Sequence, residues 1–472
     1  MRRYEILFAF VVVVILVGSW ALDRIVPAHT VAGGAASGAG ESPGNGSSNS
    51  VLSEAWYCPV PTPEGLGSSV QTVDLGSGSA LLRLTGLGTG SGATTTATAA
   101  PRSMIGTPVA PSPAPEPAQV EAFGQHTYNY LSAVNASAGG TESVCGQQPG
   151  SRWLFAQAST APGYDTHLLI GNPFPEDAVV TVRVLGPNGA NVPPGLGNYP
   201  LSPKSQTAIF LGDYYPETTS FGLDVTANRG RILVARLMKV ASTDGVRGLS
   251  LSLGVPEPST QWIFPGGQVP SSGEEDLVIA NPSDHEALVN ESFFVAAGAQ
   301  PSAGQQNVSI PAGEQVSLVV SDSVPAGTQH GTVISSANGV PVVAERVTVE
   351  GSGSSRGYET VFGTPSWGQS WVVPAGSTAG GTDTLGVVAN GLSPATVGVT
   401  VVTGTGSASP SSLSNLSITP GSRGSFDLTP YLNGQPGLAL VTASSGSIAV
   451  ENDVALPSNY RETIETVGSP GG

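Results

Sequence analysis

The sequence predicts an all-β protein: tandem β-sandwich repeats of immunoglobulin-like size, about 109 residues each, after one N-terminal transmembrane helix. Three observations lead to this fold class. An apolar run opens the chain, and a tryptophan-led motif recurs at constant spacing. The composition combines 63 Gly and 39 Pro with only 11% charged residues. Such a turn-rich, charge-poor composition favours short strands over long helices.

The apolar run is predicted to be a membrane anchor. Residues 6–22 (ILFAFVVVVILVGSWAL) are 17 positions without a charge, near the minimum for crossing a hydrocarbon core of about 30 Å. Arg2 and Arg3 precede the run, and positive charge holds a short N-terminal side in the cytoplasm. We therefore expect residues 1–24 to form an uncleaved signal anchor at the cell membrane, with the body outside the cytoplasm. A cleaved signal peptide, and hence a secreted protein, is the alternative.

The segment after the anchor is predicted to be a tether. Residues 25–52 are rich in Gly, Ser and Asn, a composition typical of flexible linkers. The two cysteines, Cys58 and Cys145, lie beyond it, and an oxidising compartment favours a disulfide between them. The closed loop would span 145 − 58 = 87 residues. Two free thiols remain the alternative.

The strongest pattern is a motif that begins with tryptophan and repeats without a change of phase. Its copies begin at Trp153, Trp262 and Trp371, so both spacings are 109 residues (262 − 153 and 371 − 262). A short apolar strand follows each tryptophan and ends, 19 residues after it, at Asn172, Asn281 or Asn390. We interpret the tryptophans as core or inter-domain packing residues, with ligand stacking as the alternative. The asparagines are interpreted as Asx-turn residues.

The motif divides the body into four segments, called repeats 1 to 4 below: 53–150, 151–259, 260–368 and 369–472. Repeat 1 is divergent, opens at Trp56 and contains a low-complexity insertion, 94–118, that is rich first in Thr and Ala and then in Pro. We expect this insertion to be extended and solvated, without packed strands. Propeller blades are the rival to sandwiches, but they take about 40–50 residues, and no half-period is evident.

Several marks of the repeats resemble a known family. A late apolar strand carries polar residues in each copy (RILVARLMKV, PVVAERVTV and IAVENDVAL). The tryptophan start, the Asn281–Pro282 pair and Glu345–Arg346 resemble the repeats of uncharacterised secreted or membrane-anchored actinobacterial proteins, the domain of unknown function numbered 5719. The likeness covers about residues 53–470. Repeat 4 departs from it, with Asn390–Gly391 and Glu451–Asn452 at these places. The resemblance implies location and architecture, but no activity.

Charge and motif content argue against several functions. The 34 acidic and 17 basic residues give a net charge of −17 and no basic cluster, which excludes nucleic acid as an expected partner. The five histidines share no repeat position, and no Gly-x-Ser-x-Gly elbow occurs. The densest acidic cluster, Glu274 to Asp276, is interpreted as a solvated turn, with calcium binding as the alternative. We expect no catalytic residue, metal or cofactor.

The leading functional hypothesis is a non-enzymatic, membrane-anchored cell-envelope protein that acts as a structural, scaffold or adhesion module. Its repeats are expected to fold as independent beads, with cell-wall glycan or another envelope protein as the partner. The alternative is a carbohydrate-binding module that uses exposed aromatics, for which Tyr214, Tyr215 and Tyr358 are the candidates. An envelope hydrolase is the third hypothesis, and no motif supports it.

Overall fold

The computed structural model describes residues 53–61, 66–87, 94–109, 118–135, 139–353, 355–376, 381–456 and 463–470. The chain divides into two compact units, residues 1–38 and 39–472, and every described residue belongs to the second. The predicted anchor, 1–24, and tether, 25–52, lie outside the described residues. Within the described ranges, no helix is long and apolar enough to cross a membrane.

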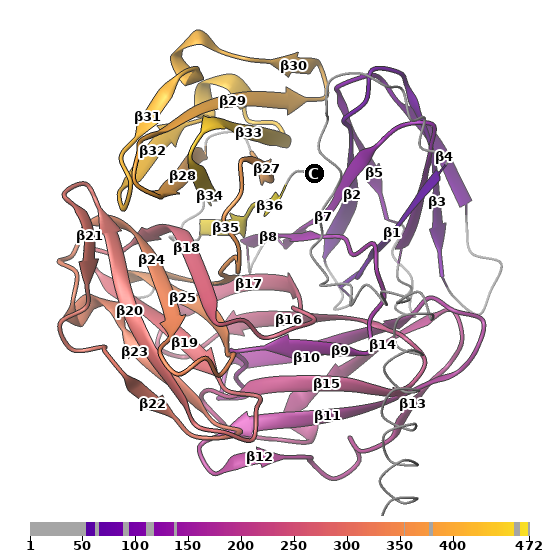
Figure 1. Ribbon diagram of the computed structural model, residues 1–472. Helices are drawn as coiled ribbons and strands as arrows, with labels where there is room; N and C mark the ends of the chain where they lie inside the picture. The colour runs from indigo at the N-terminus through magenta and orange to yellow at the C-terminus, as the bar shows by residue number, and fades with distance from the viewer. Residues whose placement is uncertain are drawn as a thin grey trace, which may run out of the picture. The chain divides into compact units, whose positions relative to one another are not determined.

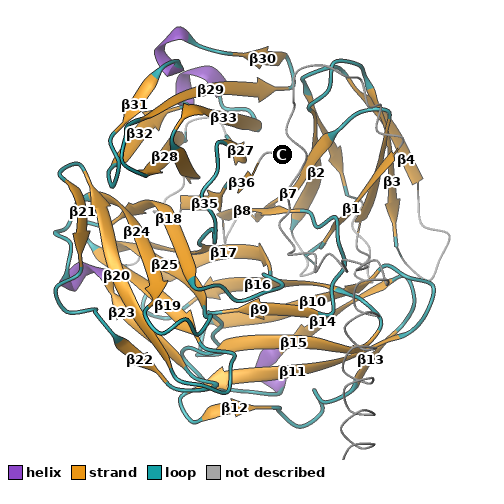
Figure 2. Ribbon diagram, viewed as in Figure 1, coloured by secondary structure: helices purple, strands orange, loops and turns teal. Residues whose placement is uncertain are grey.

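Strands dominate the fold, and the prediction of an all-β protein is confirmed (Figures 1 and 2). Repeat 1 contains β1 (Ser53–Cys58), β2 (Gly67–Asp74), β3 (Ala80–Gly86), β4 (Thr94–Ala99), β5 (Met104–Pro108), β6 (Ala118–Phe123), β7 (Thr127–Asn135) and β8 (Gly139–Val144). Repeat 2 contains β9 (Arg152–Phe155), β10 (Tyr164–Asn172), β11 (Ala178–Gly186), β12 (Gly189–Asn191), β13 (Tyr199–Leu201), β14 (Ser205–Phe210), β15 (Gly222–Arg229), β16 (Leu233–Ala241) and β17 (Val246–Leu253), with the 3-10 helix η1 (Leu211–Asp213).

The other two repeats follow the same plan. Repeat 3 contains β18 (Gln261–Gln268), β19 (Gly273–Ala280), β20 (Ala287–Val295), β21 (Gly298–Pro301), β22 (Val308–Ile310), β23 (Gln315–Val319), β24 (Gln329–Ser336), β25 (Val343–Ser352) and β26 (Ser355–Phe362), with η2 (Val320–Asp322). Repeat 4 contains β27 (Ser370–Ala375), β28 (Thr382–Asn390), β29 (Ala395–Thr403), β30 (Gly406–Ala408), β31 (Leu416–Ile418), β32 (Arg423–Asp427), β33 (Gly437–Ser445), β34 (Ser447–Ala455), β35 (Thr463–Val467) and β36 (Ser469–Pro470), with η3 (Ser411–Leu413) and α2 (Thr429–Leu432).

Each repeat forms two sheets that pack as a sandwich. The first sheets have the orders β1-β6-β3-β4, β12-β11-β15-β9, β18-β24-β20-β21 and β30-β29-β33-β27-β36. The second sheets have the orders β5-β2-β7-β8, β14-β10-β16-β17, β23-β19-β25-β26 and β32-β28-β34-β35. Strand β11 shows why these segments form strands. Its sequence AVVTVRVLG is rich in the β-branched residues Val and Thr, which favour strands, and its first six side chains alternate between buried and half-buried.

The low-complexity insertion does not match its prediction. Residues 94–99 and 104–108 form β4 and β5, which pair with β3 and β2, while residues 110–117 lie outside the described residues. The expectation that this part contains no packed strands is therefore wrong, although five of the six β4 residues are not buried. Threonine is β-branched and suits a strand, and Ala99 and Met104 supply the buried contacts that anchor the pair.

The repeats share sheets and cores, so they are not the independent beads expected from the sequence. Strand β17 of repeat 2 pairs in parallel with β26 of repeat 3, which joins two second sheets into one of eight strands. Strand β8 packs against β17, β26 against β35, and β35 against β8, so the last strands of the four second sheets contact one another in a closed circuit. The labels of β8, β17 and β35 lie close together in Figure 1.

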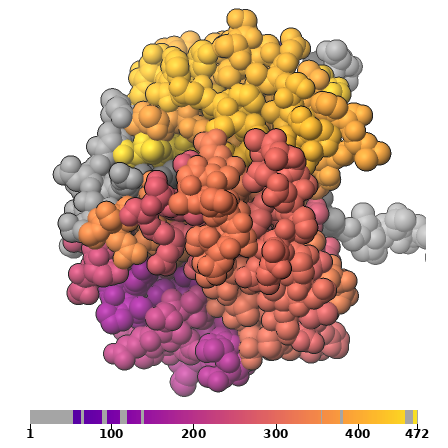
Figure 3. Space-filling model, turned by 90° about the vertical axis from the view of Figure 1, so that its left-hand side faces the viewer, coloured from indigo at the N-terminus to yellow at the C-terminus, as the bar shows by residue number. Residues whose placement is uncertain are grey.

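The hydrophobic cores also cross the repeat boundaries: the cores of repeats 1, 3 and 4 each include residues of a neighbouring repeat. The core of repeat 3 includes Leu154 and Leu185 of repeat 2. The core of repeat 4 includes Phe294 of repeat 3, and the orange atoms of repeat 3 lie against the yellow atoms of repeat 4 in Figure 3. The core of repeat 1 includes Leu251 of repeat 2 and Leu438 of repeat 4. Burial of these apolar surfaces stabilises the contacts between repeats as well as each sandwich.

Candidate functional site

The most unusual chemistry in the described residues is a set of charged side chains buried between repeats. Strands β16, β25 and β34 lie inside the second sheets, and both faces are covered over most of β16 and β34 and over the first four residues of β25. Arg236, Glu345, Arg346 and Glu451 lie on these strands and are at most 1% exposed. A charge at such a position destabilises the fold unless an opposite charge and hydrogen bonds compensate it.

Arg236 of repeat 2 and Glu345 of repeat 3 form one such pair. The Arg236 Nη1 atom lies 2.7 Å from Glu345 Oε2 and 3.0 Å from Oε1. The Glu345 carboxylate also accepts the backbone N–H groups of Ala156, at 2.8 Å, and Gln157, at 3.1 Å. Arg236 donates further to the Gln157 carbonyl and the Thr360 hydroxyl. The pair therefore joins strands of two repeats through charge and backbone at once.

The next boundary repeats this arrangement. Arg346 of repeat 3 donates to Glu451 of repeat 4, and the same carboxylate accepts the Gly266 N–H at 3.0 Å. Gln157 and Gly266 each lie four residues after the tryptophan that opens their repeat (157 − 153 and 266 − 262). A Cβ atom at Gly266 would lie 2.6 Å from a Glu451 carboxylate oxygen, so a side chain there would require this carboxylate to shift. Equivalent boundaries thus use the same backbone position and the same kind of acceptor.

A second buried group in repeat 3 has the order of a catalytic triad. His330 Nδ1 lies 3.0 Å from the Thr332 hydroxyl oxygen, and His330 Nε2 lies 3.3 Å from Glu275 Oε1. Hydroxyl, imidazole and carboxylate occur in this order in nucleophilic hydrolases. All three side chains are at most 1% exposed, however, so a substrate cannot reach the Thr332 hydroxyl in this conformation. The arrangement places a buried carboxylate within ion-pair distance of a buried imidazole.

The pKa of Glu275, which belongs to this group, and the pKa of the neighbouring Glu291 are shifted in opposite directions. Burial acts to raise the pKa of Glu275, but His330, Arg346 and Arg423 outweigh it, so the pKa is lowered and the group is charged. Burial raises the pKa of Glu291 to about 7, and the charge of Glu275 adds to this shift. The difference follows from the counter-charges, because cationic groups act on Glu275 and none is among the causes for Glu291.

The acidic cluster therefore needs a correction. Glu274 to Asp276 lie inside β19 and not in a turn before a strand, and β19 pairs with β25 on one side and β23 on the other. Glu274 is exposed, but Glu275 is fully buried. The alternation of side chains along a strand separates neighbours that the linear sequence presents as one cluster. The solvated-turn interpretation is wrong for Glu275.

The repeated tryptophans have one common contact. Trp153, Trp262 and Trp371 are buried, and their indole N–H groups donate to the carbonyl oxygens of Ile232, Val342 and Ile448 at 2.8, 2.7 and 2.9 Å. Each hydrogen bond joins the first strand of a repeat to the start of its late strand, which is β16, β25 or β34. Trp56 of repeat 1 differs: its indole N–H lies 3.5 Å from Glu54, and its ring packs edge-on against Tyr128.

The repeated asparagines divide into two kinds. Asn172 and Asn281 are buried; each Nδ2 group donates to carbonyl oxygens of two neighbouring loops, and each Oδ1 atom accepts a backbone N–H two residues later, as in an Asx turn. Asn390 is exposed, and its Oδ1 atom accepts only the adjacent Gly391 N–H among the hydrogen bonds recorded for it. At this position repeat 4 therefore shows neither these hydrogen bonds, among the described residues, nor the Asn-Pro sequence.

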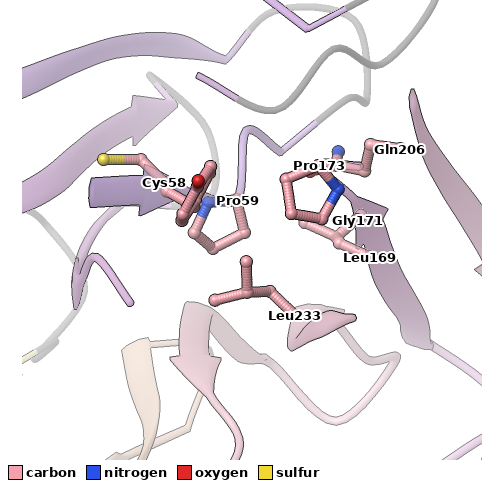
Figure 4. Close-up of a pocket in the computed structure, with 8 residues that line it drawn as sticks. Cys58, Pro59, Leu169, Gly171, Pro173, Gln206 and Leu233 are labelled. Atoms are coloured by element: carbon pink, nitrogen blue, oxygen red, sulfur yellow. The ribbon is translucent and has the colours of Figure 1, made fainter. Parts of the chain in front are cut away.

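Cys58 and Cys145 form a disulfide that closes the 87-residue separation inside repeat 1. Cys58 also borders a small pocket between repeats 1 and 2. In Figure 4, the Pro59 and Pro173 rings face each other across this pocket, with Leu233 beside them. Its volume of about 10 Å³ leaves room for at most one water molecule.

The remaining candidate residues do not come together. Tyr358 is 2% exposed and packs edge-on against Tyr164, so it cannot stack on a glycan. Tyr214 and Tyr215 are half-buried against the core of repeat 2. In the described part of the chain, no group of three or more His, Cys, Asp or Glu residues could hold a metal ion.

The sequence contains a signal for the buried pairs. Charged residues at one or two adjacent late positions of otherwise apolar strands mark Arg236, Glu345–Arg346 and Glu451. A charge inside an apolar strand indicates a buried partner. The partner could not be read from the sequence, because it belongs to a neighbouring repeat and depends on how the repeats pack.

The fold and the paired charges define a class of tandem all-β repeat proteins whose repeats share sheets, cores and ion pairs. The chain belongs to the Family of unknown function (DUF5719), whose model matches residues 121–248 and 233–458. This match confirms the family part of the resemblance.

Two solved structures have weaker likenesses. The Thermotoga maritima 1070 crystal structure is 19% identical and covers 23% of this chain and 97% of its own, with a TM-score of 0.21. The Anabaena sensory rhodopsin transducer is 23% identical and covers 20% of this chain and 99% of its own, with a TM-score of 0.17. Neither likeness is strong enough to support an argument about this chain. No curated protein matches the sequence.

Proposed function

We propose that this protein is a non-enzymatic scaffold of the cell envelope, held to the membrane by residues 1–24 and extended from it by the tether 25–52. The apolar run and the two arginines before it support the anchor. The resemblance described above supports an actinobacterial, extracytoplasmic setting. We also propose an immunoglobulin-like classification for each sandwich, supported by the size of the repeats and their two-sheet order.

One observation carries the scaffold role: the repeats are joined by buried ion pairs and a shared sheet. The Arg236–Glu345 pair, the Arg346–Glu451 pair and the eight-stranded sheet cross repeat boundaries. Breaking such a pair is costly, because one charge is then left buried. A body of this kind suits a fixed spacer or platform that holds a partner at a set distance from the membrane.

The scaffold proposal is tested in cells of the native host that express the chain with a C-terminal tag. External protease should degrade the tagged body in cells stripped of their wall and leave a short membrane-bound fragment. Chemical cross-linking of intact cells, followed by tag capture, should retain an envelope protein. A body that resists protease until the membrane is opened would contradict the proposed location.

A parallel capture on purified envelope glycan decides between the scaffold and the carbohydrate-binding alternative. Glycan retention that is lost in a Tyr214→Ala, Tyr215→Ala double variant would replace the scaffold with a carbohydrate-binding function. The matched control is Tyr431→Ala, which removes another half-buried tyrosine, in repeat 4. Equal retention of both variants would leave the tyrosines without a role in glycan binding.

A further inference from the structure

The turn that follows β28 in repeat 4 combines an exposed asparagine with a glycine. Asn390 is the last residue of β28, and Asn390, Gly391 and Leu392 are all exposed, Leu392 completely so. The Gly391 N–H donates to Asn390 Oδ1 at 2.8 Å, so this backbone nitrogen lies against the side-chain amide of the residue before it. Gly391 has a φ of +111°, and a Cβ atom there would meet nothing within 4 Å. The side-chain amide and the glycine nitrogen are therefore close together and open to water.

The equivalent asparagines of repeats 2 and 3 are protected in two ways. Asn172 and Asn281 each precede a proline, and proline has no backbone N–H group. Both asparagines are also buried, and their Nδ2 groups donate to backbone carbonyl oxygens. A reaction that needs a backbone N–H beside an accessible side-chain amide is therefore closed to these two residues and open to Asn390.

Three other exposed asparagines precede glycine in the described part of the chain, but their side chains are placed differently. Asn338 Oδ1 accepts the Leu288 N–H at 3.1 Å, and its Nδ2 group donates to the Glu286 carbonyl oxygen at 2.8 Å. For Asn188 and Asn433, no hydrogen bond between the side chain and the glycine N–H that follows is seen among the described residues. Within those residues, the turn after β28 is thus the one place where an exposed asparagine side chain contacts the N–H of the next glycine.

We propose that Asn390 is a site of spontaneous deamidation, with water as the co-reactant. The Gly391 nitrogen attacks the Asn390 Cγ atom and forms a five-membered cyclic imide, while Nδ2 leaves as ammonia and takes up the proton that the glycine nitrogen loses. Water then adds to one of the two imide carbonyl groups and breaks its bond to the nitrogen, which gives aspartate or isoaspartate. The new carboxyl group releases its proton to water, and nothing is oxidised or reduced. The product has one more negative charge than the asparagine.

The folded structure does not have to open for this reaction. The hydrogen bond between the Gly391 N–H and Asn390 Oδ1 lies within the turn, so neither reacting group has to be released from a neighbouring strand. Asn338, in contrast, must first break its bonds to Leu288 and Glu286 by local opening. The new carboxylate is exposed, so water solvates its charge. Because the reaction is spontaneous, the modified fraction rises with the age of the molecule. The inference goes beyond the scaffold role and does not depend on it.

The test is peptide mapping by mass spectrometry after timed incubation of the purified full-length chain at mildly alkaline pH. A parallel incubation in guanidinium chloride gives the rate at each asparagine without the fold. In the folded protein, Asn390 should react within about threefold of its unfolded rate, whereas Asn338 should be slowed about tenfold or more, as expected when two hydrogen bonds must open first. Asn172 and Asn281 should stay unmodified. Mapping by site keeps the reaction of Asn45, which precedes a glycine outside the described residues, separate.

The products and two variants assign the reaction to this turn. Isoaspartate at position 390 identifies the cyclic imide, since direct hydrolysis of the side-chain amide gives aspartate alone. The variant Asn390→Gln lengthens the side chain, which disfavours ring closure, and should remove the fast site. Its matched control, Asn338→Gln, should leave the rate at Asn390 unchanged. A stronger slowing of Asn390 by folding, a rate no faster than at Asn338, Asn188 or Asn433 in the folded protein, or aspartate as the only product overturns the proposal.

Discussion

Replacing Glu345 by glutamine should destabilise the protein far more than an isosteric change normally does. The substitution preserves the size of the side chain but removes the charge that neutralises Arg236, and both residues are fully buried. Arginine cannot give up its proton at ordinary pH, so its charge stays buried without compensation. Removing one member of a buried pair costs about 3–5 kcal/mol.

The reverse substitution should cost less. In Arg236→Met, Glu345 retains the N–H donors of Ala156 and Gln157, which continue to compensate its buried carboxylate. We expect a loss of about 2 kcal/mol, in the range for a hydrogen bond to a charged group. The matched control is Glu274→Gln on the exposed face of the same eight-stranded sheet, which should stay within about 0.5 kcal/mol of the unmodified protein.

The assay combines equilibrium urea unfolding, followed by tryptophan fluorescence, with hydrogen exchange at the amides of residues 156 and 157. Lost stability should decrease in the order Glu345→Gln, Arg236→Met, Glu274→Gln, and both amides should exchange faster in Glu345→Gln than in the unmodified protein. A loss below about 1 kcal/mol for Glu345→Gln, with both amides still protected, would refute the reasoning that the pair joins two repeats.

Three other predictions concern single sites. Burial raises the folded-state pKa of Glu291 from 4.5 to about 7, so its stabilising proton is fully retained below pH 4.5 and stability falls by about 3 kcal/mol as the pH rises to 7; Glu291→Gln should flatten this part of the stability curve. Asn281→Ala should lower the free energy of unfolding by about 2–3 kcal/mol through lost buried hydrogen bonds, whereas Asn390→Ala, at the exposed equivalent position, should change it by less than about 0.5 kcal/mol. Replacing Cys58 and Cys145 together by serine should cost about 4–5 kcal/mol on the chain-entropy model, seen as a lower urea midpoint that reductant no longer shifts.

Sequence reasoning reached the features that depend on local pattern. The spacing of Trp153, Trp262 and Trp371 marked residues that are all buried, because each performs the same packing role in its own repeat. Alternation of β-branched residues indicated strands, because successive side chains of a strand point to opposite faces of the sheet. Asn390 shows that spacing alone does not predict hydrogen bonds. It lies 19 residues after its tryptophan, as Asn172 and Asn281 do, but no bond from its side chain to a carbonyl oxygen is seen among the described residues.

Features that depend on neighbouring repeats were out of reach. Glu345 and Arg346 are adjacent in the sequence, yet their partners are Arg236 of repeat 2 and Glu451 of repeat 4. The pairing of β17 with β26 follows from the packing of whole sandwiches, and no local pattern encodes it. Composition also misled at residues 94–99, where threonine-rich sequence suggested a solvated segment and strand pairing made it part of a sheet.

If the four repeats stabilise one another, deletion of residues 369–472 should weaken the repeats that remain. Hydrogen exchange, read by mass, should show that strands β7 and β25 lose protection, because Tyr130 loses its bond to Gly437 and Arg346 loses Glu451. Protection across 53–368 equal to that of the complete chain would contradict the claim and restore independent beads.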